Sequence, residues 1–203
     1  TGTRLVAVGN YAFDSCSSDA NYNVGVGYAV GDAVTTADNS VFIGDVAGDA
    51  VTTGSANTFV GSGCGSACST GALNTAVGYI AGASMTTGNY NILVGSNAGD
   101  LLTTGDHNIT IGHDSGSYSV NLTTGDKNVL IGSYSYPGSS SAENRIALGY
   151  AVSGFVDNSL NFGNGATDTA CVFGSTTWTN PSDVRIKEEI KDEEIGLSFI
   201  NAL

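Results

Sequence analysis

The residues best suited to chemistry lie near the C-terminal end, where Lys187 follows Ser182 at a distance of five residues. A serine hydroxyl becomes a nucleophile when a base removes its proton, and a lysine with a depressed pKa can act as that base. Such a depression requires burial or nearby positive charge, which Arg185 or the lysines of other copies in a trimer would supply. The alternative is that Ser182 and Asp183 cap a helix and that Lys187 is solvated.

The stretch around this pair resembles the start of the intramolecular chaperone domain of phage tail spikes and tail fibres. That family includes endosialidase tail spikes and is classed as a self-cleaving peptidase. Its hallmark is Ser-Asp, one residue, Arg, one residue, Lys, and these residues are present at Ser182, Asp183, Arg185 and Lys187. Trp178 and Ile190 support the motif, together with the apolar segment that ends at Leu203.

The resemblance implies a single self-cleavage rather than a turnover enzyme. Ser182 would attack the chain at its own junction with Asp183, with Lys187 as the base, and the chaperone would be released after driving the assembly of a trimer. We expect most of the chaperone to lie beyond Leu203, and we expect a chain that starts at Thr1 without Met to be a fragment or a processed product.

The elements that must carry this motif are repeats with a period of 17 residues. The first glycine of each unit lies at Gly27, Gly44, Gly61, Gly78, Gly95 and Gly112. A second glycine follows four residues later, and a β-branched apolar residue precedes each first glycine. A fixed period in this range is the signature of a stacked repeat architecture, so the array predicts a β-solenoid or β-roll.

Each unit is predicted to run as strand, glycine turn, strand and Thr-Thr-Gly turn, with the glycines at positive φ or at close backbone approaches. The β-branched row is predicted to face the core, namely Val26, Ile43, Val60, Val77, Val94 and Ile111. A recurring asparagine is predicted to form an amide ladder between coils, the alternative being a ligand site; it is found at Asn57, Asn74, Asn91 and Asn108.

These patterns predict an all-β fold: a solenoid of 17-residue repeats in an intertwined homotrimer, with a short α-helical C-terminal segment. The solenoid shaft is placed at residues 1–157, a β-rich connector at 158–181 and the start of the chaperone at 182–203. The array also resembles the left-handed β-rolls in the head domains of trimeric adhesins. A trimer is expected because the resembled families trimerise and because a thin roll has little core alone.

Two departures from the repeat bear on binding and redox chemistry. A three-residue insertion follows Gly116, where Tyr118, Tyr134 and Tyr136 are expected to cluster and either stack on sugar rings or pack as ordinary edge aromatics. Cys64 and Cys68 replace small or apolar residues of other repeats and are interpreted as core hydrophobes, with a local disulfide as the alternative. Cys16 and Cys171 carry no such signal, which leaves the redox compartment open.

Composition excludes several classes of function. The formal net charge of −13 argues against a nucleic-acid partner, because phosphate binding requires clustered cations. No apolar run approaches the ~20 residues that span a bilayer, so no membrane insertion is expected. No cofactor or metal is expected, since the four cysteines follow no metal spacing and the aspartates do not follow the nine-residue calcium repeat.

The leading hypothesis is therefore the distal shaft of a trimeric phage tail fibre or tail spike, located on the virion, that binds a host cell-surface glycan or protein. A trimeric bacterial surface adhesin, exposed outside the cell, is the alternative. An ice-binding solenoid is motivated by the repeated Thr-Thr pairs, and a glycan-cleaving enzyme by carboxylates on the turns at Asp45, Asp49, Asp100 and Asp114.

Overall fold

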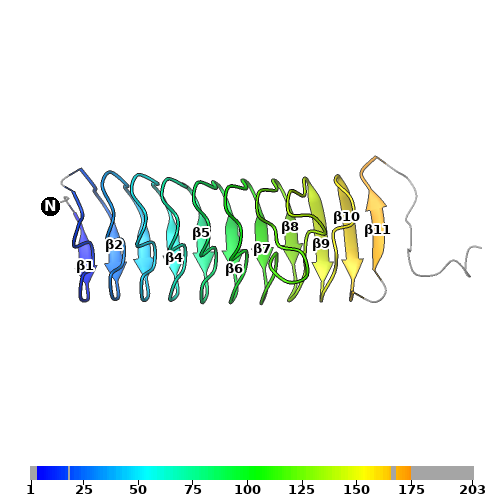
Figure 1. Cartoon of the computed structure of the whole chain (residues 1–203), viewed down its shortest axis with the longest axis horizontal. Helices are drawn as coiled ribbons and strands as arrows, with labels where there is room; N and C mark the ends of the chain where they lie inside the picture. Colours follow the sequence, from blue (N-terminus) through cyan, green and yellow to red (C-terminus); the bar gives the residue numbers. More distant parts are fainter. Residues whose placement is uncertain (1–3, 18, 166–167, 175–203) are drawn as a thin grey trace, which may run out of the picture.

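The computed structural model describes residues 4–17, 19–165 and 168–174, which form a rod with one strand in each coil (Figure 1). The strands are β1 (Val6–Val8), β2 (Val24–Val26), β3 (Val41–Ile43), β4 (Thr58–Val60), β5 (Thr75–Val77), β6 (Ile92–Val94), β7 (Ile109–Ile111), β8 (Val129–Ile131), β9 (Arg145–Gly149), β10 (Ser159–Gly163) and β11 (Thr169–Val172). These residues contain strands and turns but no helix, which confirms an all-β solenoid. The predicted C-terminal helix lies outside the described residues.

One sheet runs the length of the rod in sequence order. Strands β1 to β10 pair in parallel with their neighbours, and β11 closes the sheet by pairing antiparallel with β10. Paired residues of neighbouring strands in the regular array are 17 residues apart in the sequence: Val41 lies opposite Thr58, and Thr58 lies opposite Thr75. The 17-residue period of the sequence is therefore the length of one coil, and the sheet continues into the predicted connector through β10 and β11.

Each coil contains one strand, of three residues from β1 to β8, rather than the two strands that the repeat predicted. The segment after the second glycine consists of turns, because the backbone reverses at two left-handed corners in every coil. One corner lies two residues after the first glycine and includes Val46 and Ile80, with φ of 47° and 48°. The other lies five residues before that glycine and includes Leu73 and Tyr90. Left-handed corners interrupt strand pairing, so the second predicted strand is wrong.

The predicted inward row is also wrong: Val26, Ile43, Val60, Val77, Val94 and Ile111 face outward. Val77 is 37% exposed, whereas its neighbour Ala76, in the middle of β5, is completely buried. Successive side chains of a strand point to opposite faces, so a shift of one residue moves the whole row to the other face. The inner positions are the middle residues of the short strands, including Phe42, Phe59 and Leu93.

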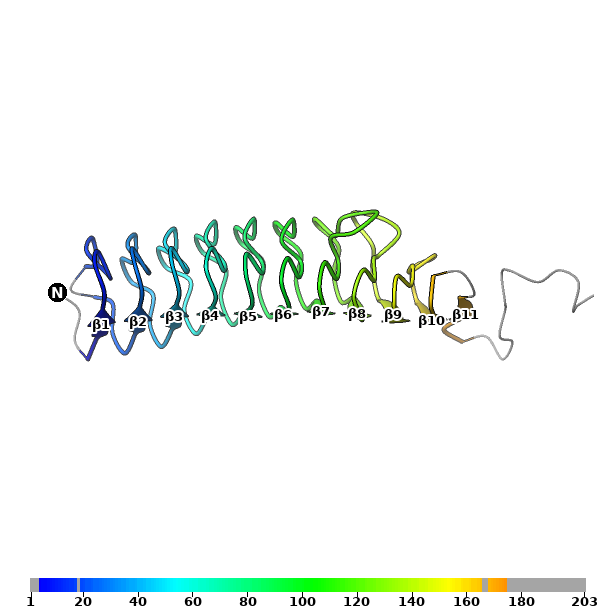
Figure 2. The same cartoon turned by 90° about the horizontal axis from the view of Figure 1, so that it is seen from below.

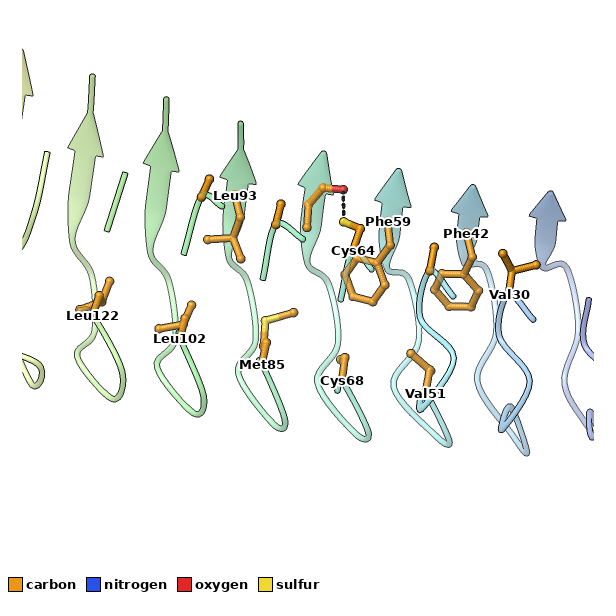
Figure 3. Packing of buried hydrophobic residues seen from close by; sticks show 14 of the residues in the cluster. Val30, Phe42, Val51, Phe59, Cys64, Cys68, Met85, Leu93, Leu102 and Leu122 are labelled. Carbon is orange, nitrogen blue, oxygen red and sulfur yellow. Dashed lines mark hydrogen bonds between the residues drawn. The ribbon is translucent and has the colours of Figure 1, made fainter. Parts of the chain in front are cut away.

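The core consists of columns of side chains that run from coil to coil (Figure 3). The inner strand position contributes Phe42 and Phe59, whose rings stack with centroids 5.6 Å apart. The facing column lies seven residues after the first glycine of each regular unit and is fully buried at Val34, Val51, Cys68, Met85 and Leu102. Leu122, also fully buried, continues it after the three-residue insertion. This second column agrees with the apolar position that the repeat predicted.

Glycine is required where adjacent coils touch. At Gly61 and Gly78 φ is 142° and 143°, and a Cβ on Gly78 would lie 2.3 Å from the carbonyl oxygen of Gly95. The second glycine of each unit has a different partner: a Cβ on Gly65 would lie 2.6 Å from the Phe59 ring. Both predicted roles of the glycines, positive φ and close approach, are therefore confirmed.

Replacing Gly78 with Ala should destabilise the solenoid by about 3 kcal/mol or more, because it combines a glycine-only conformation with a clash against backbone. The matched control is Gly174→Ala, where φ is also positive at 84° but no atom of the described residues lies within 4 Å of the added Cβ. The measurement is the midpoint of urea unfolding for each variant. Equal shifts for the two variants would show that contact between coils does not restrict Gly78.

The recurring asparagines form a buried amide ladder inside the stack. The Nδ2 atoms of Asn74, Asn91 and Asn108 each donate to the Oδ1 atom of the asparagine one coil earlier, at 3.1 to 3.2 Å. Each Nδ2 also donates to a backbone carbonyl, as Asn91 does to Gly105 at 2.9 Å. The amides thereby satisfy both backbone and side-chain polar atoms in the core, and this is the predicted ladder.

Arg145 ends the ladder. Its backbone N–H donates to Oδ1 of Asn128, while its side chain, only 8% exposed, is paired with Asp157 at 2.7 Å. The guanidinium also donates to the carbonyl oxygens of Pro137 and Gly154. The backbone N–H of Glu143 and then Arg145 itself lower the pKa of Asp157, so the buried cation has a carboxylate partner near neutral pH.

Candidate functional site

The predicted cleavage site does not lie in the part of the chain that the structure describes. Ser182, Asp183, Arg185, Lys187 and Trp178 all fall in the segment 175–203, outside the described residues. The nucleophile, the base and the junction therefore remain predictions from the sequence. The candidate site that the described residues do form is a group of aromatic side chains around the insertion.

The aromatic cluster is defined by His113, Tyr118, Tyr134, Tyr136 and Tyr150. It spans the coils that follow β7, β8 and β9, where the inserted residues enlarge one loop of the rod, beside the label β7 in Figure 1. The Tyr118 ring centroid lies 4.8 Å from that of Tyr134 and 6.2 Å from that of Tyr136. Tyr134 also makes edge contacts with Tyr150 at 5.5 Å and with His113 at 5.2 Å.

The cluster presents both rings and polar atoms to solvent. Tyr118 is 54% exposed and Tyr150 is 60% exposed, and the Tyr134 ring contacts both, tilted against Tyr118 and edge-on to Tyr150. Beside the rings, Asp114 accepts a hydrogen bond from Asn97 at 2.7 Å and lies 3.4 Å from His113. Mutual edge contacts order these rings before anything binds, which reduces the entropy lost on binding.

The sequence predicted the grouping of Tyr118, Tyr134 and Tyr136 but missed Tyr150 and His113. The missed signal was the phase of the repeat. His113 and Tyr150 both come directly after the first glycine of their coils, Gly112 and Gly149, and Tyr134 comes one residue later in the coil between them. Coils stack in register, so residues at the same or neighbouring positions of the repeat lie close together, and Tyr134 contacts both His113 and Tyr150.

The asparagine and threonine rows have structural roles. The Asn amides are buried and hydrogen-bonded within the stack, so the ligand-binding interpretation of these residues has no support. In the turns, the hydroxyl of the first Thr of a pair donates to a carbonyl of the next coil, as Thr52 does to Ser69 at 3.0 Å. The second Thr of each pair, such as Thr53, is exposed, and in the first complete pair Thr35 is exposed as well. Turn and stack chemistry thus explains the Thr-Thr pairs.

The turn carboxylates do not form a catalytic or metal-binding group among the described residues. Burial raises the pKa of Asp49; its backbone hydrogen bonds oppose this shift, and the nearby carboxylates of Asp32 and Asp45 add to it. The described part of the chain contains no group of three or more His, Cys, Asp or Glu side chains placed to hold a metal ion. Asp45 lies near enough to act on the Asp49 carboxylate, whereas Asp100 and Asp114 belong to later coils.

The cysteines of the fourth coil are core residues. Cys64 and Cys68 are fully buried free thiols; the Cys64 thiol donates to the carbonyl of Ala76 at 3.1 Å (Figure 3). The interpretation as small hydrophobes is confirmed and the local disulfide is excluded. Desolvation raises the pKa of each thiol to about 12.

Thiol reagents should leave Cys64 and Cys68 unmodified in the native protein at pH 8. With a pKa of about 12, roughly one thiol in ten thousand is ionised at that pH. Because folding raises the pKa from its ordinary value of 9.0, the neutral thiols stabilise the fold below pH 9, and this contribution is lost as the pH rises from 9 towards 12. Peptide mapping after alkylation, with urea-unfolded protein as the control, measures the protection. Rapid native labelling of both residues would contradict their burial.

Comparisons complete the description of the site. The described residues include no helix that is long and apolar enough to cross a membrane. Searches against protein-family models, curated proteins and solved structures found no match.

Proposed function

We propose that this chain is the shaft of a trimeric phage tail fibre or tail spike, which extends from the virion and attaches it to the host. The observation that carries the proposal is the unbroken parallel ladder from β1 to β10, in which every coil is hydrogen-bonded to the next. At about 4.8 Å per strand, ten strands make a rod of roughly 43 Å. A shaft needs length and stiffness, and this stack supplies both.

The stiffness has identifiable causes. Backbone hydrogen bonds link each coil to its neighbour on the sheet and on the turns, for example from Gly78 to Val60 at 2.8 Å and from Thr52 to Ser69 at 2.8 Å. The amide ladder adds a buried column of hydrogen bonds parallel to the rod. Bending the rod would stretch the hydrogen bonds between coils on its convex side. The asparagine amides are buried away from water, so a hydrogen bond lost there would leave a polar group without a partner.

The terminal motif supports a fibre that needs help to assemble. Parallel strands joined by long crossovers fold slowly, because their contacts lie far apart in sequence. A trimerising chaperone after the shaft would provide a nucleus, and cleavage at Ser182 would then remove it. The motif at 182–187 and the parallel solenoid are thus complementary parts of one assembly strategy.

The simplest test of the fibre is its mass and shape. Purified protein with a complete C-terminal chaperone should have the mass of three chains by light scattering at micromolar concentration and should appear as rods in negative-stain micrographs. A single-chain mass under these conditions would overturn the proposal. A trimeric bacterial adhesin would pass the same test, so antibodies to the rod must also label virions rather than bacterial surfaces.

The aromatic cluster is the part of the shaft best suited to contact the host, through sugar rings. Replacing Tyr118 and Tyr150 with Ala should weaken binding to immobilised cell-surface glycans by about tenfold or more, since each exposed ring of a binding site contributes on the order of 1 kcal/mol. The matched control replaces Tyr11 and Tyr28, an equally exposed pair in edge contact at 5.7 Å near the N-terminal end. Equal losses in both variants, or no loss in either, would place the receptor contact elsewhere.

A further inference from the structure

The outer face of the sheet is the largest feature of the rod that the shaft and the aromatic cluster do not explain. In Figure 2 the strands lie along one side of the rod, while the loops and turns form the other sides. In strands such as β3, β5 and β7 the middle residue is buried in the core and the two flanking side chains face away from it, and in β9 the outward positions are Ile146 and Leu148. Here the outer face means the two outward rows of β1 to β9.

The outer face is apolar along its whole length. It comprises eighteen positions in strict register, of which sixteen are Val, Ile or Leu and two are Thr. One row is Val6, Val24, Val41, Thr58, Thr75, Ile92, Ile109, Val129 and Ile146, and the other is Val8, Val26, Ile43, Val60, Val77, Val94, Ile111, Ile131 and Leu148. No charged residue occurs on it, although the chain has a formal net charge of −13.

Such a face is unusual for a parallel sheet that meets water. Parallel sheets are almost always covered on both sides, and strands that read as continuous apolar runs are typical of that burial. Nine strands about 4.8 Å apart and three residues wide give a face of roughly 380 Å². This is the size of the largest apolar patch on a typical single-chain protein, and such a patch is often functional. The residues themselves thus predict that something covers this face.

The repeat identifies what covers it. A partner that packs along all nine strands must present apolar side chains with the same spacing along the rod. A second copy of this chain has such side chains on the same strands. The chain's own segment 182–203 is a poor cover, because nine of its 22 residues are charged. An anionic membrane surface is disfavoured by the acidic character of the rod, and a glycan would find no polar side chains except two threonines.

We propose that copies of this chain associate through the outer face, with their long axes parallel and their coils in register. β-branched side chains from neighbouring copies then interdigitate at the strand spacing, as they do between packed sheets. The proposal deepens the trimeric shaft and rests on it for the number of copies, but the surface is argued from this face alone. Assembly would bury the apolar face and leave the charged turns and the aromatic cluster on the outside of the fibre.

The test places charge on the outer face without touching the core. The double variant Val60→Asp with Val94→Asp should sediment as a single chain at concentrations where the wild type is assembled, with at least a hundredfold weaker association. The matched control puts the same charges on the exposed turn row, as Thr53→Asp with Thr87→Asp, and should assemble like the wild type. Far-ultraviolet circular dichroism establishes that each variant retains its β-structure. Unchanged assembly of the face variant would overturn the proposal.

Two further sets of variants test the interface if the aspartates prevent folding: uncharged substitutions on the outer face, and single cysteines that report which residues of two copies lie close together. Val60→Thr with Val94→Thr introduces a residue that the face already tolerates at Thr58 and Thr75, and it should fold but associate at least tenfold more weakly. For the register, Val77→Cys should form disulfide-linked copies on oxidation, whereas Thr53→Cys should not, because a disulfide needs Cα atoms within about 7 Å. Equal association of the Thr variant and wild type, or equal cross-linking of the two Cys variants, would overturn the interface.

The outcomes separate this interface from the proposed fibre. A trimer that none of the face variants weakens overturns the interface and leaves the trimeric shaft intact. A dimer that the face variants dissociate supports the interface and overturns the three-chain fibre. A wild-type protein that remains a single chain at high micromolar concentration overturns both.

Discussion

An aspartate at position 76 should unfold the solenoid, whereas an aspartate at position 77 should leave it folded. Ala76 is completely buried in the middle of β5, beside the Cys64 thiol that donates to its carbonyl. Val77 points outward and is 37% exposed. An unpaired carboxylate at the first position has no partner in the core and should destabilise the protein by about 4 kcal/mol or more.

The contrast between these neighbours tests the orientation of the whole array. Circular dichroism at 20 °C should show a loss of β-structure for Ala76→Asp and a spectrum like that of the wild type for Val77→Asp. Any loss of assembly in Val77→Asp lowers its melting temperature by mass action, so the comparison is made on the spectrum before melting. A folded Ala76→Asp beside an unfolded Val77→Asp would reverse the assignment of inner and outer faces.

Replacing Ser182 with Ala should abolish cleavage between Ser182 and Asp183 in a protein in which the complete chaperone follows. The substitution removes the hydroxyl that the motif supplies as nucleophile, and the fibre should remain uncut but trimeric. Lys187→Ala should slow cleavage by about a hundredfold or more while still allowing assembly, because general-base catalysis commonly contributes that much. Denaturing gels measure the cut, and light scattering measures the trimer.

Two further variants separate base catalysis from charge. Lys187→Arg should behave like Lys187→Ala, since a guanidinium does not lose its proton near neutral pH. Lys191→Ala removes a nearby lysine outside the motif and should cleave at the wild-type rate. Cleavage of Ser182→Ala at the wild-type rate would show that the nucleophile lies elsewhere.

The sequence by itself determined the architecture of the rod. The 17-residue period fixed the coil length because glycine is the only residue that fits where coils touch, as at Gly78 against Gly95. The recurring asparagines fixed the ladder, since a buried amide in a stack finds its partners one period away. The aromatic grouping near Tyr118 followed from an insertion that interrupts the period. The glycines and the asparagines recur with the period, and the insertion interrupts it. Both kinds of feature can be recognised from the sequence without a structure.

Only the tertiary structure decided which side of each strand enters the core. Strands such as β6, with Ile92, Leu93 and Val94, are apolar at all three positions, so alternation gives no direction. The direction depends on where the chain turns, and it turns at left-handed residues such as Val46 and Ile80 that sequence propensity disfavours there. Closure of the coil sends the middle residue inward, because the second glycine packs against that side chain, as Gly65 does against Phe59. The mostly β-branched rows that flank the middle residue therefore face outward. Packing of the core does not explain why these outward positions are apolar.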